Sequence, residues 1–426
     1  MKLIRKLLVV RYQNRPLTVI EEDGKIVSFS ISEEEESILG NIYIAQVQNI
    51  VKNIQAAFLT FADGKIGYYS LEENKNPIFT NLKQTDKICI GDCILVQVER
   101  ESVKTKPPTM TSHINLTGKY AVLTAGNTHF GISSKISDHA WREQCKEYFS
   151  GYCNEEYGFI LRTNAYRVNL EIIEKEIQIL VASYRKICDD GRHRIKGSCL
   201  YKNPPDFINQ VKNIWQDGLK AILTDQKEYY LQLKEYLLKE QAEDIEKLCF
   251  YQDSWPLSKC YNIERQLERA LSERVWLDCG AYLVIQPTEA LTVVDVNTGK
   301  CIGKRNNPDT FLQINLEAAK ELAVQMRLRN LSGIILVDFI NMEDANNRIL
   351  LAELEKLIQR DAVKTVLHGI TALGLVEITR KKIRKPLHEQ LLTACTVCHG
   401  TGKVNLKNME DIQNGKEKNI IGSGFE

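Results

Sequence analysis

Neither sign of charge predominates in this sequence. Among 426 residues, 56 are Lys or Arg and 55 are Asp or Glu, which gives a net charge of +1. This balance excludes a generally polycationic protein that coats nucleic acid, but it leaves room for a local basic groove, because binding fields depend on how charges are distributed. Hydrophobic residues make up 43% of the chain, enough for several buried cores, and the length suggests roughly three or four domains.

Long apolar runs are also missing. No run reaches the roughly 18 residues that a membrane-spanning helix needs. The first ten residues, MKLIRKLLVV, contain a short apolar run without a small-residue cleavage site, and they continue into the strand-like alternation of RYQNRPLTVI. This pattern is not that of a secretory signal peptide, so we expect a cytoplasmic protein with no membrane span.

Close pairs of cysteine or histidine are scarce. The twelve cysteines are scattered, and only Cys395 and Cys398 stand at C-x-x-C spacing. Reduced thiols are therefore favoured over a secreted disulfide framework. The seven histidines are dispersed too, so no close His pair suggests a metal-free nuclease that works through a cyclic phosphate.

The pattern along the chain changes from β-rich to mixed. Short strands are predicted in residues 1–35, and four or five more from GNIYIAQVQNI to CILVQVER favour a small barrel. Residues 100–110 are basic and interrupted by prolines, which predicts a loop. Beyond them we expect the strands KYAVLTAGN, GISSKI and FILRT, helices near 140–150 and 169–189, a charged helical pattern over 205–248, and alternating strands and helices over 271–390.

Two predicted strands carry a carboxylate where apolar residues are expected. In LTVVDVNTGK (291–300), Asp295 and Asn297 point to the same face of the strand, and NTG makes the turn. In GIILVDFINM (333–342), Asp338 lies where the strand leaves the core. An unpaired buried carboxylate is costly and two together repel, whereas Mg²⁺ is often held by one or two carboxylates.

A magnesium site of this kind suits phosphodiester hydrolysis, because the metal activates water and neutralises charge on the phosphate. Asn297 either orients the attacking water or holds an aspartate in place. The simpler alternative is that each aspartate is a strand-end residue that accepts backbone amides. The helix predicted between them, over 309–330, ends with Arg327 and Arg329, which either meet an RNA backbone or complement the helix C-terminus.

The C-x-x-C pair in CTVCHGTGK offers two zinc ligands, or three if His399 contributes. Structural zinc normally has four ligands. Two chains that each give the thiolates of Cys395 and Cys398 would complete the set and staple a dimer. A redox pair and inert thiols are the alternatives.

Four blocks together resemble the ribonuclease E/G family: VVDVNTGK, NLEAAKELAVQMRLRNLSGIILVDFINM, LGLVEITRKK and the C-x-x-C-x-G-x-G knuckle. The match extends to about residue 403. The resemblance implies an endoribonuclease that is specific for single strands, depends on Mg²⁺, leaves 5′-phosphate and 3′-hydroxyl ends, and acts in rRNA processing or mRNA turnover. It implies that Asp295 and Asp338 bind the metal with help from Asn297, and that Cys395 and Cys398 form a zinc link between two subunits.

The resemblance also assigns RNA contacts. The β-rich block is similar to an RNA-binding OB-fold, in which Phe58 and Tyr68 occupy aromatic positions and Lys106 a basic loop position. FILRTNA resembles a sensor for RNA 5′ ends, in which Arg162 and Thr163 bind a monophosphate. Taken without the resemblance, the two aromatic residues are typical of a core, and the Arg-Thr pair of a solvated strand end.

The family pattern implies an α+β multidomain fold, whose segments are an RNase H-like part (1–35 and 206–270), the OB-fold domain (36–112), the 5′-sensor region (113–205), a DNase I-like α/β catalytic domain (271–390), the zinc knuckle (391–403) and a polar tail (404–426). We expect a homodimer with single-stranded RNA as partner and no scaffold region for partner enzymes. Two other hypotheses remain: a catalytically weak RNA-binding protein that keeps the fold, and a zinc-linked structural partner.

Overall fold

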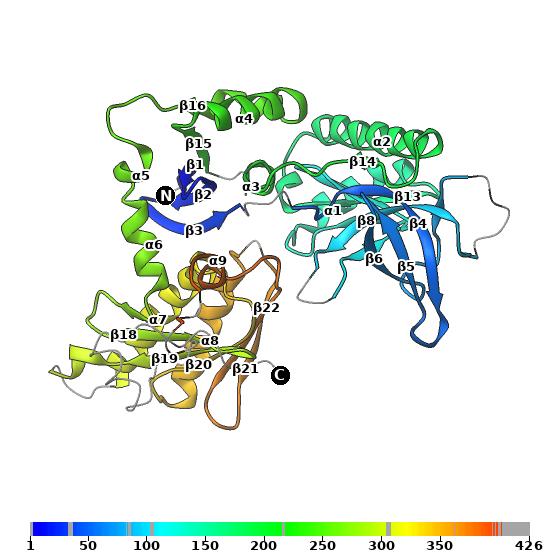
Figure 1. The fold of residues 1–426 in the computed structure, drawn as a ribbon. Coiled ribbons are helices and arrows are strands. Elements are labelled where there is room, and N and C mark those ends of the chain that lie inside the picture. The colour runs from blue at the N-terminus through cyan, green and yellow to red at the C-terminus, as the bar shows by residue number, and fades with distance from the viewer. Residues whose placement is uncertain are drawn as a thin grey trace, which may run out of the picture. The chain divides into compact units, whose positions relative to one another are not determined.

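The computed structural model describes residues 3–32, 37–81, 83, 87–102, 106–214, 218–303, 308–361, 363–393, 395, 396, 398 and 402. The chain divides into two compact units, Met1–Glu264 and Arg265–Glu426, which we call unit 1 and unit 2. Both mix helices and strands (Figure 1), so the α+β class is confirmed. Among the described helices, none combines the length and the apolar character needed to cross a membrane.

Unit 1 contains a sheet whose strands come from two distant segments. Its order is β16-β15-β1-β2-β3, in which β1 runs parallel to β15 and antiparallel to β2. Its strands are β1 (Arg5–Tyr12), β2 (Arg15–Glu22), β3 (Lys25–Ile31), β15 (Leu219–Thr224) and β16 (Leu248–Phe250). The helices α3 (Asp206–Asn213) and α4 (Lys227–Glu240) contribute Phe207, Val211 and Leu233 to a core shared with Leu7 and Ile222.

The uniformly helical pattern expected over 205–248 is wrong in its middle. The segment LKAILT forms β15 between β1 and β16, because Leu219 and Ile222 are buried in the core under the helices. Charged residues on both sides of this short apolar run concealed it.

A second sheet of unit 1 closes into a five-stranded barrel. The strands pair in the order β4-β5-β6-β9-β8, and β8 pairs again with β4, an arrangement consistent with OB-like folds. Side chains of Tyr43, Phe61 and Tyr69 fill the interior. The sheet comprises β4 (Ile42–Val51), β5 (Ala56–Phe61), β6 (Lys65–Ser70), β7 (Ile78–Phe79), β8 (Cys93–Arg100), β9 (Thr109–Thr111) and β14 (Cys199–Tyr201).

The third sheet of unit 1 has the order β10-β11-β13-β12. Two helices share its core, in which Phe149 of α1 and Ile177 of α2 pack with Phe159. The elements are β10 (Asn115–Thr117), β11 (Ala121–Ala125), β12 (Phe130–Ile132), α1 (His139–Phe149), β13 (Tyr157–Leu161) and α2 (Leu170–His193). Two short helices follow: α5 (Leu257–Cys260) belongs to unit 1, and α6 (Ile263–Leu271) begins in unit 1 and ends in unit 2.

Unit 2 is built on a single sheet with the order β17-β18-β19-β20-β22-β21. One face packs against α7 and α8 through residues such as Val294, Ile335, Leu322 and Leu354 (Figure 1). The elements are β17 (Arg274–Trp276), β18 (Tyr282–Pro287), β19 (Leu291–Asn297), α7 (Pro308–Leu328), β20 (Gly333–Asp338), α8 (Asp344–Ile358), β21 (Thr365–Ile370), β22 (Val376–Arg380) and α9 (Leu387–Leu391). The expected alternation of strands and helices is confirmed, and α7 matches the predicted helix to within two residues.

Candidate active site

The two aspartates singled out in the sequence lie side by side. Strands β19 and β20 are parallel neighbours, and their register places Asp295 directly opposite Asp338. Val294 and Val337, one residue earlier on each strand, point to the other face and are fully buried against α7 and α8. The alternation of side chains therefore sends both carboxylates to the face opposite α7 and α8, which we call the open face. Both carboxylates are exposed there.

Asn297 completes this cluster. Its Nδ2 atom donates a hydrogen bond of 2.6 Å to Oδ2 of Asp295, so it orients one carboxylate and leaves the other oxygen available. The chain then turns at Gly299, which has a φ of 54°. A Cβ atom there would collide with the carbonyl oxygen of Gly280, so this turn requires glycine.

A residue that the sequence analysis missed holds the segment after β20. Asn315 on α7 is fully buried. Its Nδ2 donates to the carbonyl oxygen of Ile340 at 2.8 Å, and its Oδ1 accepts from the amide of Ile340 at 3.1 Å. Asn315 thus anchors the chain two residues beyond Asp338. A polar residue on the buried side of an apolar helix was the only signal for this role.

Arg329, which follows α7, had two predicted roles, and the structure contradicts one of them. Arg329 is buried, and its Nε donates to Oε1 of Gln325 at 2.6 Å. Burial lowers the pKa of Arg329 to about 10. The proposal that Arg329 meets an RNA backbone is therefore wrong, because its side chain is enclosed by the fold.

The donor set around Asp295 suits a hard cation. The two carboxylates and the amide of Asn297 present oxygen ligands, which Mg²⁺ prefers. Within the described ranges, no group of three or more His, Cys, Asp or Glu side chains could hold a metal ion. A site with only two carboxylates matches the habit of Mg²⁺, which keeps several water ligands and takes others from a substrate phosphate.

The predicted RNA-contacting aromatic residues lie next to each other on the barrel. Phe58 and Tyr68 are direct cross-strand partners on β5 and β6, and their ring centroids are 6.2 Å apart in an edge-to-face arrangement. Both side chains are half-buried, whereas their neighbours Ala57 and Tyr69 are buried in the core. Lys106 is exposed and lies three residues before β9, the strand that pairs with β6 at Tyr68.

The predicted sensor pair lies immediately after β13. Arg162 donates from Nη1 to the carbonyl oxygen of Gly118 at 2.5 Å and from Nη2 to Oδ1 of Asn213 at 2.7 Å. Burial lowers the pKa of Arg162, and the charge of Glu176 opposes this shift. The hydroxyl groups of Thr163 and Ser133 are 3.1 Å apart and hydrogen-bonded. Both predicted side chains are thus engaged by the protein itself.

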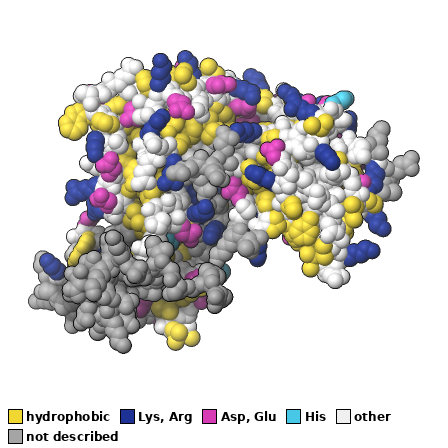
Figure 2. All heavy atoms as spheres, viewed as in Figure 1, with side chains coloured by type: hydrophobic (Ala, Val, Ile, Leu, Met, Phe, Trp, Pro, Cys, Tyr) yellow, Lys and Arg dark blue, Asp and Glu magenta, His cyan; other side chains and the backbone are white. Residues whose placement is uncertain are grey.

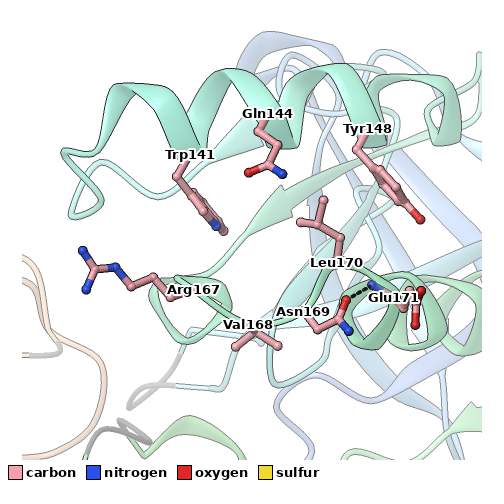
Figure 3. A pocket seen from close by; sticks show the side chains of 8 residues that line it. All are labelled: Trp141, Gln144, Tyr148, Arg167, Val168, Asn169, Leu170 and Glu171. Carbon is pink, nitrogen blue, oxygen red and sulfur yellow. Dashed lines mark hydrogen bonds between the residues drawn. The ribbon is translucent and has the colours of Figure 1, made fainter.

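A groove of about 610 Å³ lies between α1 and the start of α2. Figure 3 shows Trp141, Gln144 and Tyr148 of α1 facing the segment from Arg167 to Glu171. None of the predicted site residues lines it. Over the described part of the face seen in Figure 2, Lys and Arg side chains are interspersed with Asp and Glu, in keeping with the balanced composition.

The knuckle is described only in part. Cys395 is exposed and Cys398 is half-buried, while His399 lies outside the described residues. The zinc link therefore stays a prediction.

The fold and the site define an α+β protein that has two carboxylates on an open sheet and a separate OB-like barrel. Comparison with known proteins agrees with this class. Residues 115–383 match the model of the Ribonuclease E/G family. Ribonuclease G of Escherichia coli (strain K12) is 34% identical over 386 residues, which are 87% of this chain and 78% of the relative.

Two further relatives extend the comparison. Ribonuclease G of Haemophilus influenzae is 31% identical over 411 residues, covering 94% of this chain and 84% of the relative. Ribonuclease E of Nostoc sp. is 29% identical over 407 residues, covering 93% of this chain and 58% of the relative. The chain belongs to the Ribonuclease E/G family, and it is accordingly an endoribonuclease.

Proposed function

We propose that this protein cleaves single-stranded RNA internally with the help of Mg²⁺ held by Asp295 and Asp338, and that it leaves 5′-phosphate and 3′-hydroxyl ends. The observation that carries this proposal is the register of β19 and β20, which sets the two carboxylates opposite each other on an exposed face. A bound magnesium ion supplies charge neutralisation at the phosphate and lowers the pKa of a bound water.

The protein's own groups have defined tasks in this proposal. Asp295 and Asp338 are register partners whose carboxylate oxygens would hold the same magnesium ion. The hydrogen bond from Asn297 restrains the rotation of the Asp295 side chain. Asn315 keeps the backbone after β20 in place, which preserves the alignment of Asp338. Such preorganisation matters because small displacements of catalytic groups cost large factors in rate.

RNA binding is proposed to involve the barrel as well. Phe58 and Tyr68 offer half-buried ring surfaces on adjacent strands, and base stacking on such rings is tolerant of sequence. Lys106 adds a positive charge near the same strands. Arg162 and Thr163 would bind a 5′-monophosphate only by exchanging hydrogen bonds that they make to Gly118, Asn213 and Ser133.

The biological setting is also part of the proposal. We propose a cytoplasmic homodimer, joined by zinc at Cys395 and Cys398, that acts on rRNA precursors and mRNA. The relatives named ribonuclease G and ribonuclease E support this role.

The decisive experiment compares the parent protein with Asp338→Asn on a 5′-monophosphorylated single-stranded oligonucleotide in Mg²⁺. Removing one metal-binding charge is expected to lower kcat by at least about 100-fold, since transition-state charge stabilisation of several kcal/mol is lost. RNA binding is expected to persist. Mapping of the product ends tests the predicted 5′-phosphate and 3′-hydroxyl, and Asp344→Asn on α8 serves as the matched control.

Undiminished cleavage by Asp338→Asn would refute the metal site. RNA binding by the parent without any cleavage would instead favour the hypothesis of a catalytically weak RNA-binding protein.

A further inference from the structure

The open face of the unit 2 sheet carries an aromatic cluster beside the acidic pair. Trp276 on β17 pairs with Tyr282 on β18, and Tyr282 pairs in turn with Asn297 on β19. Residues directly opposite each other in antiparallel strands point to the same face. Trp276 and Tyr282 therefore share a face with Asn297, and so with the two aspartates.

A second row of side chains runs parallel to the first. Arg274 is opposite Val284, Val284 is opposite Asp295, and Asp295 is opposite Asp338. This row joins a cation at one edge of the sheet to the carboxylate pair in the middle. Arg274 is two positions before Trp276 on β17, so both side chains point to the open face.

The contacts within the cluster give it the geometry of a stacking platform. The ring centroids of Trp276 and Tyr282 are 5.0 Å apart. The guanidinium carbon of Arg274 is 4.5 Å from the Tyr282 centroid and 5.8 Å from the Trp276 centroid. Nevertheless 52% of Trp276 remains exposed. The cluster therefore combines an open indole surface with an exposed cation.

The simpler explanation is that Trp276 only covers the edge of the sheet. Core packing does not explain the position of Trp276, because the core of unit 2 lies on the opposite face, where Leu283 and Ile285 are buried. Arg274 is also exposed, so the cation does not neutralise a buried acid. An aromatic surface with a neighbouring guanidinium is the combination that binds a nucleobase and its phosphate.

The distance to the acidic pair fits an RNA strand. Strands β17 and β19 are separated by two strand spacings, or about 10 Å. This span corresponds to at most about three nucleotides at ~3.4 Å per stacked nucleotide. A base on the platform would thus belong to a nucleotide close to the cleaved linkage.

We propose that Trp276, supported by Tyr282 and Arg274, stacks on one base of single-stranded RNA within about three nucleotides of the cleaved phosphate. This inference rests on the proposed function, because it takes Asp295 and Asp338 as the site of cleavage. The platform is distinct from the aromatic pair on the barrel, which belongs to unit 1. It determines how tightly a base next to the cleavage site is held.

The test uses the full-length protein and an RNA oligonucleotide with one mapped cleavage site. Abasic nucleotides are placed one at a time at the three positions on each side. For the parent protein, one such position should lower kcat/KM by roughly 5- to 150-fold, as expected for the loss of one base stack. Trp276→Leu should lower kcat/KM on the intact RNA by a similar factor and become insensitive to that abasic position.

Two variants provide controls. Trp276→Phe keeps an aromatic ring and should recover most of the activity and of the sensitivity to the abasic position. Trp255→Leu removes another exposed tryptophan, which lies in unit 1 and is 67% exposed, and should behave like the parent. Melting temperatures of all variants identify any that fail to fold. If Trp276→Leu is one of them, the abasic series on the parent still decides, because a parent that loses no activity at any abasic position would overturn the inference.

The inference is overturned if Trp276→Leu cleaves the intact RNA as well as the parent does, or if it keeps the parent's sensitivity to the abasic position. The proposed function has a separate readout. Full cleavage by Asp338→Asn would overturn the metal site. The contribution of Trp276 to RNA affinity is measured without cleavage, by comparing oligonucleotide binding to Asp338→Asn with binding to the double variant that also carries Trp276→Leu.

Discussion

At the scale of single residues, the site shows how a carboxylate is tolerated within an apolar strand. Asp295 follows a buried valine and precedes another, yet its own side chain points to the open face and receives a hydrogen bond from Asn297. The strand can therefore keep an unbroken core face while it presents charge on the other side. Asp338 uses the same alternation on the neighbouring strand.

Lys212 is a residue whose burial has a measurable cost. It is 6% exposed, and it lines a cavity of about 350 Å³ with Tyr236 and Gln241. Burial lowers its pKa from 10.5 to about 8, and the nearby charge of Arg162 acts in the same direction, against Glu240 and Glu176. The unfolded chain therefore binds this proton more tightly than the folded protein does.

We predict that Lys212→Met stabilises unit 1 at pH 7. Unfolding takes up a proton between about pH 8 and 10.5. The parent's free energy of unfolding therefore rises with pH across that window, because the penalty for the buried charge disappears. At pH 7 the buried charge costs about 1–3 kcal/mol, which Lys212→Met removes, and its advantage should shrink towards pH 10. Melting temperatures at pH 7, 9 and 10 measure this, with the exposed Lys239→Met as control. A melting difference that stays constant over these three values would contradict the prediction.

At the scale of elements, one side chain of α2 organises the connection between β10 and β11. Glu176 accepts hydrogen bonds from the amides of Lys119, Tyr120 and Ala121 at 2.9, 2.7 and 2.8 Å. Burial raises the pKa of Glu176, and these amides oppose the shift. The same connection contains Gly118, whose carbonyl accepts from Arg162, so Glu176 also positions the predicted sensor arginine.

Glu176→Ala is expected to lower the free energy of unfolding of unit 1 by roughly 2–4 kcal/mol, because three backbone donors lose a charged acceptor. Glu176→Gln keeps one acceptor oxygen and should lose less. Urea denaturation followed by circular dichroism measures both changes. The neighbouring Lys175→Ala, which is exposed, is the control, and a Glu176→Ala variant as stable as this control would refute the role.

The elements also show where sequence reasoning succeeded. Strands with strict alternation, such as β19, and helices with clear boundaries, such as α7, were predicted because their signals are local. β15 was missed because only its pairing with β1, more than two hundred residues earlier, identifies LKAILT as a strand. The closure of the barrel by β4 and β8 was likewise beyond local patterns, although the number of short strands indicated a barrel.

At the scale of the whole molecule, the proposed zinc link makes a prediction about assembly. Two thiolates per chain satisfy a tetrahedral zinc only if two chains contribute. Cys395→Ser should therefore abolish both the zinc content and the dimer, since one remaining thiolate per chain binds zinc weakly. RNA binding should remain.

Zinc analysis by mass spectrometry and molar mass by light scattering test this directly. The parent should contain one zinc ion per two chains. Cys249→Ser, which removes another exposed thiol, should match the parent. A Cys395→Ser protein that retains both metal and dimer would rule out the link.

The sequence by itself determined the nature of the candidate site: two aspartates and an asparagine at strand ends, in blocks whose order indicated the family. These features follow from alternation and from short motifs, which act over a few residues. Only the tertiary structure decided that Asp295 and Asp338 are register partners, that Asn315 anchors the following segment, that Arg329 is enclosed, and that Trp276 stands on the same face. Those facts depend on which strands become neighbours and which face the helices cover, and burial of the common core selects both.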